Sequence, residues 1–288
     1  MSTVTADVVI CGAGIAGIAT AWHLTVKYGV ENVVLVDERP PLSLTSDKST
    51  ECYRNWWPGP GNAMVSLMNR SINILEELAY ETGNTFHLNR RGYLFATGDP
   101  ARIPDLKQTA QEAAELGAGP VRLFNGQPGE PDYIPAPAYG FEHQPIGSDI
   151  ILDQQIIRRH FPYLTEKTVA VAHARRAGWF SGQTLGMTLL EQARRHGARL
   201  LEARVEGVDS DGGQVQAVRL SSRGGPMTVS TPNFVNAAGP FLKDVAKMVG
   251  VKLPVYFECH VKIAINDHLG AVPREAPLII WTDAQHLP

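Results

Sequence analysis

Residues 7–37 read DVVICGAGIAGIATAWHLTVKYGVENVVLVD, and this stretch decides the fold class. Residues 7–11 form a short apolar run that predicts a strand, and the run passes directly into a GxGxxG loop that starts at Gly12. Helical spacing over residues 14–28 and a second apolar run at residues 33–36 follow. The order strand, glycine loop, helix and strand predicts a dinucleotide-binding α/β unit. The alternative is a glycine-rich turn that holds no ligand.

Each glycine of the loop has its own physical role in this interpretation. Gly12 permits the tight turn out of the strand, and Gly17 allows the helix to pack closely on the sheet. Gly14 has no Cβ, so a pyrophosphate can approach its backbone, next to a helix N-terminus that carries about +0.5 elementary charge. Asp37 ends the second apolar run, where a carboxylate can accept hydrogen bonds from ribose hydroxyls.

The composition is that of a globular chain without a strong preference for charged partners. Its 288 residues are enough for two domains, and the 44% that are hydrophobic can form a sizeable core. The net charge of −3 and the pI near 6.3 argue against nucleic-acid or anionic-membrane partners. No apolar run reaches the roughly 18 residues of a membrane-spanning helix. The strand predicted at residue 7 leaves no room before it for a signal peptide.

The cysteine content predicts the compartment. Cys11, Cys52 and Cys259 are widely spaced and odd in number, so they form neither a disulfide framework nor a zinc site. We therefore expect no metal and a reducing, cytoplasmic location. Cys11 and Cys52 are interpreted as small buried side chains rather than nucleophiles.

Apolar periodicity and turn residues predict the remaining elements. Helices are expected at residues 61–82 and 106–116, between Asp153 and Pro162, between Ser181 and Gly197, and at 240–249. Strands are expected at residues 92–96, 199–203, 205–208, 214–221, 227–231, 234–237 and 255–265, with a strand-like stretch at 278–281. The strands between residues 205 and 231 form an antiparallel meander, and the Pro- and Gly-rich residues 118–149 are expected to be irregular.

Several stretches in a fixed order give the chain a family resemblance. Ala21 extends the loop to GxGxxGxxxA, a form common in FAD-binding units, and the meander is followed by NAAGP at residues 236–240. GWF at 178–180, EQARRHGA at 191–198, and TSDKS at 45–49 with Arg54 after it are further matches. Over about residues 5–265, the chain resembles the FAD-dependent oxidoreductases of the D-amino-acid oxidase, sarcosine oxidase and glycine oxidase family.

The resemblance implies a fold and a division into domains. The fold is α/β, with a Rossmann-like FAD-binding domain of the glutathione reductase type and an inserted mixed-sheet substrate domain. The FAD-binding domain is expected at residues 1–90 and 179–246, and the substrate domain at 91–178 and 247–288. Family members continue beyond this point, so the substrate domain is expected to be incomplete at its C-terminus.

The resemblance also implies FAD as the cofactor, bound without a covalent link. Some relatives attach FAD to a histidine in the loop near residue 47, but Asp47 and Lys48 stand there, and no His occurs between residues 24 and 86. A lysine near N1 of the flavin would stabilise its reduced form, and Lys48 is the candidate; the alternative is a solvated loop lysine. The expected cofactor-binding residues are Gly12, Ala13, Gly14, Ile15, Ala16, Gly17, Asp37, Glu38, Arg39, Thr45, Ser46, Lys48, Ser49, Val205, Ala238 and Gly239.

Two residues are candidates for the reaction itself. Arg54 matches an arginine that grips the substrate carboxylate in relatives, and a guanidinium can do so with two parallel hydrogen bonds. Its alternative is an arginine that reaches solvent or pairs with Glu51. His260, on the strand expected at 255–265, could remove the amine proton, although a hydrogen-bonded structural histidine is the alternative. The pairs at residues 90–91 and 175–176 are interpreted as solvated arginines without a role.

The resemblance therefore implies an FAD-dependent oxidoreductase that oxidises the C–N bond of an amino acid or an N-methylated amine by hydride transfer to the flavin. The electron acceptor, oxygen or a carrier protein, cannot be derived from the sequence. Three alternatives stay open. The chain could oxidise a hydroxy acid or glycerol phosphate, act as a non-catalytic FAD-containing assembly factor, or bind NAD.

Overall fold

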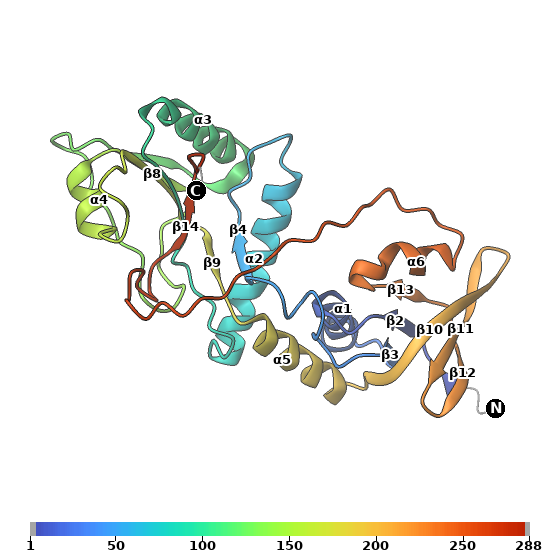
Figure 1. Cartoon of the computed structure of the whole chain (residues 1–288). Coiled ribbons are helices and arrows are strands. Elements are labelled where there is room, and N and C mark those ends of the chain that lie inside the picture. The colour runs from blue at the N-terminus through green and yellow to red at the C-terminus, as the bar shows by residue number, and fades with distance from the viewer. Residues whose placement is uncertain (1–3, 286–288) are drawn as a thin grey trace. The chain divides into compact units, whose positions relative to one another are not determined.

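The computed structural model describes residues 4–285, which divide into two compact units. The first unit contains the residues up to Ser49 together with Gly182–Ile263, and the second contains Thr50–Ser181 together with the stretch from Ala264. Both units combine helices with mixed sheets, which confirms the predicted α/β class (Figure 1). The predicted domain boundaries, with a first break after residue 90, remain a prediction.

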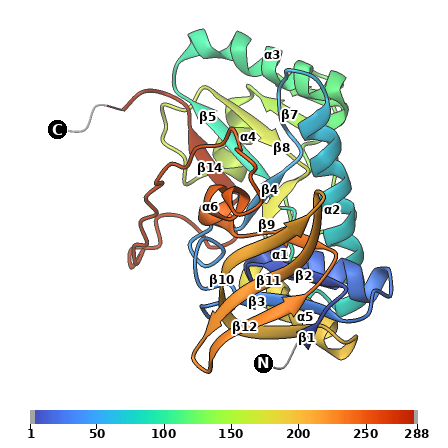
Figure 2. The ribbon, with the colours of Figure 1, turned by 90° about the vertical axis from the view of Figure 1, so that its right-hand side faces the viewer.

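The first unit is built on a seven-stranded sheet in the order β1-β12-β11-β10-β3-β2-β13. Strands β13, β2, β3 and the start of β10 run parallel. Strands β10, β11 and β12 form the predicted antiparallel meander (Figure 2). The bounds are β1 (Val4–Thr5), β2 (Val8–Cys11), β3 (Val33–Asp37), β10 (Arg199–Asp211), β11 (Gln214–Ser222), β12 (Gly225–Ser230) and β13 (Phe234–Asn236).

The central strands of this sheet are apolar because helices and neighbouring chain cover them. All of β2 and the first four residues of β3 are buried. Helix α1 (Ile15–Trp22) continues as a π-helical turn to Lys27 and packs against α5 (Gly182–Arg195), where Trp22 Nε1 donates a hydrogen bond to Gln192. A 3-10 turn (Gly239–Phe241) and α6 (Leu242–Lys247) follow β13.

Residues 199–211 form one long strand instead of the two predicted. Strand β10 pairs with β3 through Arg199–Glu202 and then with β11 from Ala203 onward. A shift in register between Val205 and Gly207 follows shortly after this change of partner. The sequence-based break at residue 204 therefore corresponds to this irregularity and not to a strand end.

The second unit contains a five-stranded sheet, β14-β5-β8-β7-β6, and a two-stranded sheet, β4-β9. Three helices, α2 (Ala63–Thr82), α3 (Ile103–Ala113) and α4 (Gln154–His160), belong to the same unit, and α3 packs on β7 and β8. The strand bounds are β4 (Cys52–Arg54), β5 (Tyr93–Thr97), β6 (Val121–Phe124), β7 (Ser148–Ile151), β8 (Ala170–Ala174), β9 (Ala177–Trp179) and β14 (Leu278–Trp281). The Pro- and Gly-rich region is only partly irregular, because it contains β6 and the first residues of β7.

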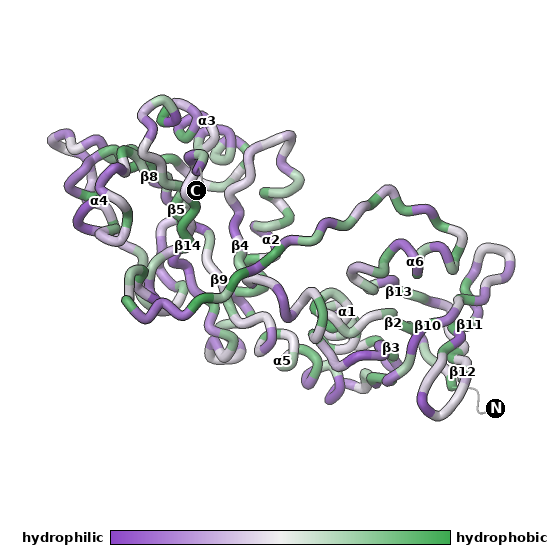
Figure 3. The backbone as a smooth tube through the Cα atoms, viewed as in Figure 1, coloured by the Kyte–Doolittle hydropathy of each residue, from purple (hydrophilic) through white to green (hydrophobic). Residues whose placement is uncertain are grey.

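The strand predicted at residues 255–265 is wrong, because these residues have no regular secondary structure. Apolar and polar residues alternate along this extended stretch, which joins α6 to the residues before β14 (Figure 3). However, Val261, Ile263 and Ile265 are 79–83% exposed. Alternation predicts a strand only where a neighbouring strand completes the hydrogen bonds, and the described residues provide none here.

Three further observations concern residues 4–285 as a whole. No helix among them is long and apolar enough to cross a bilayer. Nor does any group of three or more His, Cys, Asp or Glu side chains in this range come together as a metal site. All three cysteines are free; Cys11 is buried and Cys259 exposed.

Candidate nucleotide site and buried charge network

Two glycines of the loop are required by the packing of the chain itself. Gly12 has a φ of +110°, and a Cβ there would lie 2.4 Å from the carbonyl oxygen of Ala237. A Cβ on Gly17 would lie 1.9 Å from the carbonyl oxygen of Gly12. The backbone of Gly12 therefore packs closely against the chain after β13, and the backbone of Gly17, in α1, packs closely against the loop. Both glycines are therefore necessary with or without a ligand.

Gly14 differs from the other two glycines. Its φ of −74° suits any residue, and the nearest atom to a Cβ built on it is the Ser46 Oγ, at 3.4 Å. Nothing in residues 4–285 requires a glycine at this position. The bare backbone instead faces a cavity, which is the arrangement that a closely approaching pyrophosphate needs.

The N-terminus of α1 adds donors to the same place. The Ile15 N–H donates a hydrogen bond to the Ser46 Oγ at 3.0 Å, which fixes the Ser46 hydroxyl beside Gly14. The first N–H groups of a helix have no partner within it, and the helix dipole favours an anion there. Gly14, Ser46 and the helix end therefore form a cradle suited to a diphosphate.

Asp37 lies at the end of β3 with its carboxylate held in place. One oxygen accepts a hydrogen bond from the Ala13 N–H at 2.8 Å, and the other from the Arg39 N–H at 3.0 Å. Each carboxylate oxygen can accept a second hydrogen bond. Since Asp37 lines the same cavity, its remaining acceptor capacity is available to ribose hydroxyls.

The cavity has a volume of about 320 Å³ and lies at the carboxyl ends of β2, β3 and β13, where ligands bind in doubly wound sheets. Ten of the residues expected to bind the cofactor line it: Gly12, Gly14, Asp37, Glu38, Arg39, Thr45, Ser46, Val205, Ala238 and Gly239.

The other expected cofactor residues do not line the cavity. Ala13, Ile15, Ala16 and Gly17 build the loop and the helix start behind it. Lys48 is exposed and paired with Asp47, and Ser49 is exposed as well. The sequence interpretation missed most of the 40–44 segment and α6, whose Asp244 and Val245 are lining residues. It also missed Phe241, whose ring lies 5.5 Å from the Arg39 guanidinium carbon.

Cys11 borders the cavity as a neutral thiol. Burial, with a smaller contribution from the negative charge of Asp37, raises the pKa of Cys11 to about 12. A thiol is a nucleophile only as the thiolate. This agrees with the interpretation of Cys11 as a packing residue.

Arg54, the expected carboxylate-binding residue, lies on β4 in the second unit. Its guanidinium carbon lies 3.9 Å from the centre of the Trp57 ring and 5.5 Å from that of Tyr93. Its Nε donates to the carbonyl oxygen of Trp56 at 3.3 Å. Stacking occupies the face of a guanidinium and leaves its edge suited to in-plane hydrogen bonds with a carboxylate.

His260, the expected base, lies in the extended stretch that does not form a strand. Its side chain is exposed, and Nε2 lies 3.4 Å from a carboxylate oxygen of Glu258. The strand on which His260 was expected is therefore absent from the described residues. A catalytic role for His260 remains a prediction.

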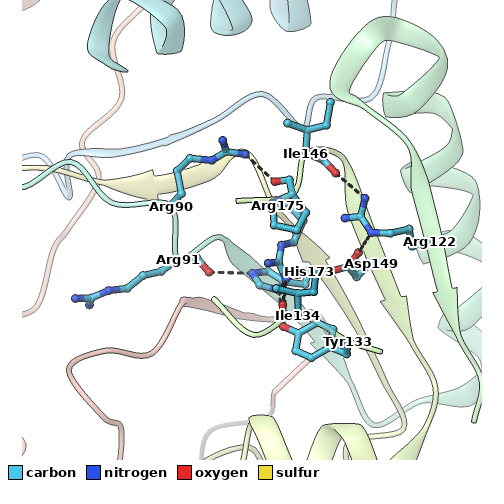
Figure 4. A network of polar contacts seen from close by, with 10 residues as sticks. Arg90, Arg91, Arg122, Tyr133, Ile134, Ile146, Asp149, His173 and Arg175 are labelled. Carbon is cyan, nitrogen blue, oxygen red and sulfur yellow. Dashed lines mark hydrogen bonds and ion pairs between the residues drawn. The ribbon is translucent and has the colours of Figure 1, made fainter. Parts of the chain in front are cut away.

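The interpretation of the two arginine pairs as solvated is wrong for Arg90, Arg91 and Arg175, which are at most 9% exposed. Arg175 donates to Asp149 at 3.1 Å, and Arg122 donates to the other oxygen of Asp149 at 2.6 Å (Figure 4). Arg176 pairs with Glu76 at 3.1 Å. No local pattern marks these residues, because their partners come from distant parts of the chain.

His173 is fully buried in the same network. Its Nε2 lies 2.9 Å from the Arg91 carbonyl oxygen, which can only accept, so Nε2 carries the proton (Figure 4). Its Nδ1 then accepts from the Tyr133 hydroxyl at 2.8 Å and from Arg175 at 3.0 Å. Burial and the charge of Arg175 lower the pKa of His173 well below its usual value, so the ring is neutral.

Comparison with known proteins places this geometry among flavoproteins. A family model described as "FAD dependent oxidoreductase" matches residues 7–284. The mitochondrial dimethylglycine dehydrogenase of Homo sapiens is 25% identical over 293 residues, covering 95% of this chain and 28% of that protein. The sarcosine oxidase subunit beta of Rhizobium meliloti is 24% identical over 260 residues, covering 88% of this chain and 54% of that protein. The chain thus spans 28–54% of the length of these two relatives.

Solved structures agree on the fold. L-proline dehydrogenase from P. horikoshii superposes with a TM-score of 0.68 at 19% identity, covering 87% of this chain and 57% of that chain. Glycine oxidase from Geobacillus kaustophilus gives a TM-score of 0.68 at 21% identity, covering 88% and 60%. These matches confirm the predicted Rossmann-like FAD-binding fold with a mixed-sheet substrate part.

Proposed function

This chain belongs to the DAO family of FAD-dependent oxidoreductases, and from that premise we propose that it oxidises the C–N bond of an amino acid or an N-methylated amine. The single observation that carries the proposal is the ligand-ready position of Gly14, next to Ser46 and Asp37, in a chain of this family. The names of the relatives, dimethylglycine dehydrogenase and sarcosine oxidase subunit beta, support the substrate class.

We assign the dinucleotide to the cavity of the first unit. The diphosphate would lie against the Gly14 backbone within reach of the Ser46 hydroxyl, and a ribose would donate to the Asp37 carboxylate. The adenine would lie along the edge of β10 at Val205, and Ala238 and Gly239 would present backbone from the opposite side. Attachment would be non-covalent, since Asp47 and Lys48 stand where some relatives carry a histidine.

The chemistry that FAD supplies when bound is acceptance of a hydride, and the protein contributes position and charge. Arg54 would hold the substrate carboxylate, because its guanidinium is already oriented by stacking on Trp57. A charged hydrogen bond of this kind contributes about 1.5–3 kcal/mol. His260 is the candidate for accepting the amine proton. The imine product would then hydrolyse in water.

The direct test is the absorbance spectrum of the purified protein followed by anaerobic titration with sarcosine, dimethylglycine, glycine, proline and a panel of hydroxy acids. The proposal expects a flavin spectrum that bleaches with at least one amine. Bleaching by hydroxy acids alone would replace it with C–OH oxidation, and a flavin that no substrate reduces would favour an assembly factor. Peroxide formation on re-aeration would identify oxygen as the acceptor, and its absence a carrier protein.

Gly14→Val tests the cofactor site itself. The branched side chain would fill the place of the diphosphate, so the purified variant should contain little or no FAD while its far-UV circular dichroism stays unchanged. Ile15→Val is the matched control, because it alters the next side chain, outside the cavity, and keeps the N–H that binds Ser46. Full flavin content in Gly14→Val would show that the site is misplaced.

We also propose a cytoplasmic location, supported by cysteines that are all free in the described residues. Several relatives are named as mitochondrial proteins, so a matrix location is the alternative. Fractionation of cells that express the tagged chain distinguishes the two compartments.

A further inference from the structure

Arg91 is held in the second unit by hydrogen bonds to main-chain carbonyls. Its Nε donates to Ala138 at 2.8 Å, its Nη2 donates to the same oxygen, and its Nη1 donates to Arg274 at 2.5 Å. The side chain is 9% exposed, and burial lowers its pKa. A guanidinium has the fixed donor fork that such a bridge requires. Arg91 thereby ties the loop at residue 138 to the segment at residue 274.

Two aromatic rings lie near the same guanidinium. Its central carbon lies 4.8 Å from the Trp179 ring and 5.8 Å from the Tyr139 ring. Trp179 is the last residue of β9 and pairs with Cys52 of β4. Arg91 therefore fixes the orientation of the indole as well as the position of two chain segments.

An apolar cavity of about 440 Å³ lies next to this indole. Arg91 positions two of its walls. It contacts Trp179 directly, and it holds the segment around Arg274 through a hydrogen bond to the main chain. The residues that line the cavity are Thr50, Cys52, Trp179, Val272, Pro277, Leu278 and Ile279. Almost all of these residues are apolar, and the cavity is open to solvent on one side, so it suits a hydrocarbon group.

A positively charged side chain, that of Arg54, lies near this apolar cavity. The Arg54 guanidinium carbon lies 5.5 Å from the centre of the Tyr93 ring, and Cys52, which lines the cavity, packs against the buried cluster that contains Tyr93. Cys52 and Arg54 project from the same face of β4, because they are two residues apart on a strand. A ligand that carries both a carboxylate and an apolar group matches this arrangement.

We propose that the cavity receives the apolar substituent of the amine substrate, and that Arg91 is the positioning residue that sets its width. The inference rests on the proposed amine oxidation and makes it more specific: the substrate is an amino acid whose nitrogen or side chain carries a group far larger than methyl. The Arg91 carbonyl is anchored on His173, while its side chain leads away from that network (Figure 4). The residue that positions the cavity walls is thus itself held by a hydrogen bond to a fully buried side chain.

The test uses the flavin-loaded protein with N-methylglycine, N-propylglycine and N-benzylglycine, which share a carboxylate and a C–N bond. The expected result is a rise in kcat/KM of at least tenfold from N-methylglycine to N-benzylglycine, mainly through KM. A preference for N-methylglycine over the larger substrates would overturn the proposal. Tryptophan fluorescence titration measures the binding of the same compounds without turnover.

Arg91→Met keeps apolar bulk but removes the donors and the charge. We expect it to lower kcat/KM for N-benzylglycine at least tenfold through KM, to change that for N-methylglycine less than about threefold, and to keep the flavin content. Arg91→Lys, which keeps the charge without the fork, should give an intermediate value. Arg195→Met is the matched control, since Arg195 is an exposed helix residue paired with Glu191. Equal losses for both substrates would reduce Arg91 to a structural role and overturn its part in the proposal.

Val272→Trp tests the cavity should the Arg91 variants fail to fold, because Val272 is half exposed and tolerates a larger side chain. Filling the cavity should abolish the preference for N-benzylglycine and spare N-methylglycine; an unchanged preference would locate the apolar group elsewhere. The two proposals fail differently. If no amine reduces the flavin, the proposed function fails, while the cavity proposal fails if fluorescence also detects no tighter binding of N-benzylglycine.

Discussion

The glycine loop of the first unit and the charge network of the second differ in the groups that make their contacts. At Gly12 and Gly17 the loop excludes side chains, and its contacts are those of bare backbone. Around Asp149 and His173 the contacts are made by long charged and aromatic side chains from three strands, β6, β7 and β8, and from residues outside the strands. The first region is described by a pattern a few residues long, and the second by none.

The difference predicts different weaknesses. A backbone site tolerates changes of charge nearby but fails when a Cβ is added, because there is no volume for one. A buried charge network tolerates small changes of shape but fails when one charge is removed, because its partners are left without compensation. Variants of each kind therefore test whether the comparison holds.

The largest effect is expected for Asp149→Asn. Asp149 is 2% exposed and accepts from both Arg122 and Arg175, so the change leaves two guanidinium groups facing a neutral amide. Removing one member of a buried ion pair costs about 3–5 kcal/mol. Urea unfolding followed by circular dichroism should show a loss of this size in the transition of the second unit.

Glu191→Gln is the control for that prediction, because the Glu191–Arg195 pair is exposed on α5. Exposed pairs contribute about 0–1 kcal/mol, so this variant should unfold almost like the parent protein. If Asp149→Asn also lost less than about 1 kcal/mol, the network would not be the stabilising interior that the comparison assumes.

Many of the residues named from the sequence line the cavity of the first unit, because the determinants of that cavity are local. The loop, the helix start and Asp37 lie within about thirty residues, and Gly14 and Asp37 line the observed cavity. The lining contributed by Phe241 and α6 could not be found, since α6 reaches the cavity only through the tertiary fold. The residues of the 40–44 segment were missed although they lie between two predicted groups.

The sequence predicted the second unit less well. The stretch at residues 92–96 gave a correct strand from its apolar run, but β7, β8 and β9 were missed. The arginines at 90–91 and 175 were placed in solvent because charged residues are seldom buried. Their burial depends on Asp149, His173 and main-chain carbonyls that no window of sequence contains. The prediction for residues 255–265 was wrong in the opposite direction: a strand was expected from the sequence pattern, but no partner strand is present among the described residues.

A smaller effect is expected for Gly17→Ala. The added Cβ would lie 1.9 Å from the Gly12 carbonyl oxygen, so α1 or the loop has to move. Overpacking of this kind costs about 1–3 kcal/mol, measured as the free energy of unfolding of the first unit. Gly14→Ala is the matched control within the same loop, because its Cβ meets only the Ser46 Oγ at 3.4 Å. Equal destabilisation by both variants would contradict the separation of structural from ligand-facing glycines.

The smallest effect is a pH dependence of stability that originates at His173. Burial and Arg175 lower the pKa of His173 in the folded protein, whereas in the unfolded chain it titrates near 6.5. Below that pH the unfolded chain therefore binds a proton that the folded chain does not. The contribution of His173 to the free energy of unfolding is therefore fully present above pH 6.5. Below that pH the free energy of unfolding should fall by up to about 1.4 kcal/mol for each pH unit.

Urea unfolding between pH 7.5 and 5 measures this slope above the range in which exposed carboxylates titrate. His173→Gln should lower the overall stability and also flatten the slope, because no group with a depressed pKa remains at that position. His160→Gln is the control: burial also lowers the pKa of His160, but that ring is only partly covered, so most of the slope should survive. A slope that persists in His173→Gln would mean that other groups cause it and that His173 contributes nothing. In the parent protein the buried ring would then accept a proton despite Arg175. The network would then be more adaptable than the glycine loop in charge as well as in shape.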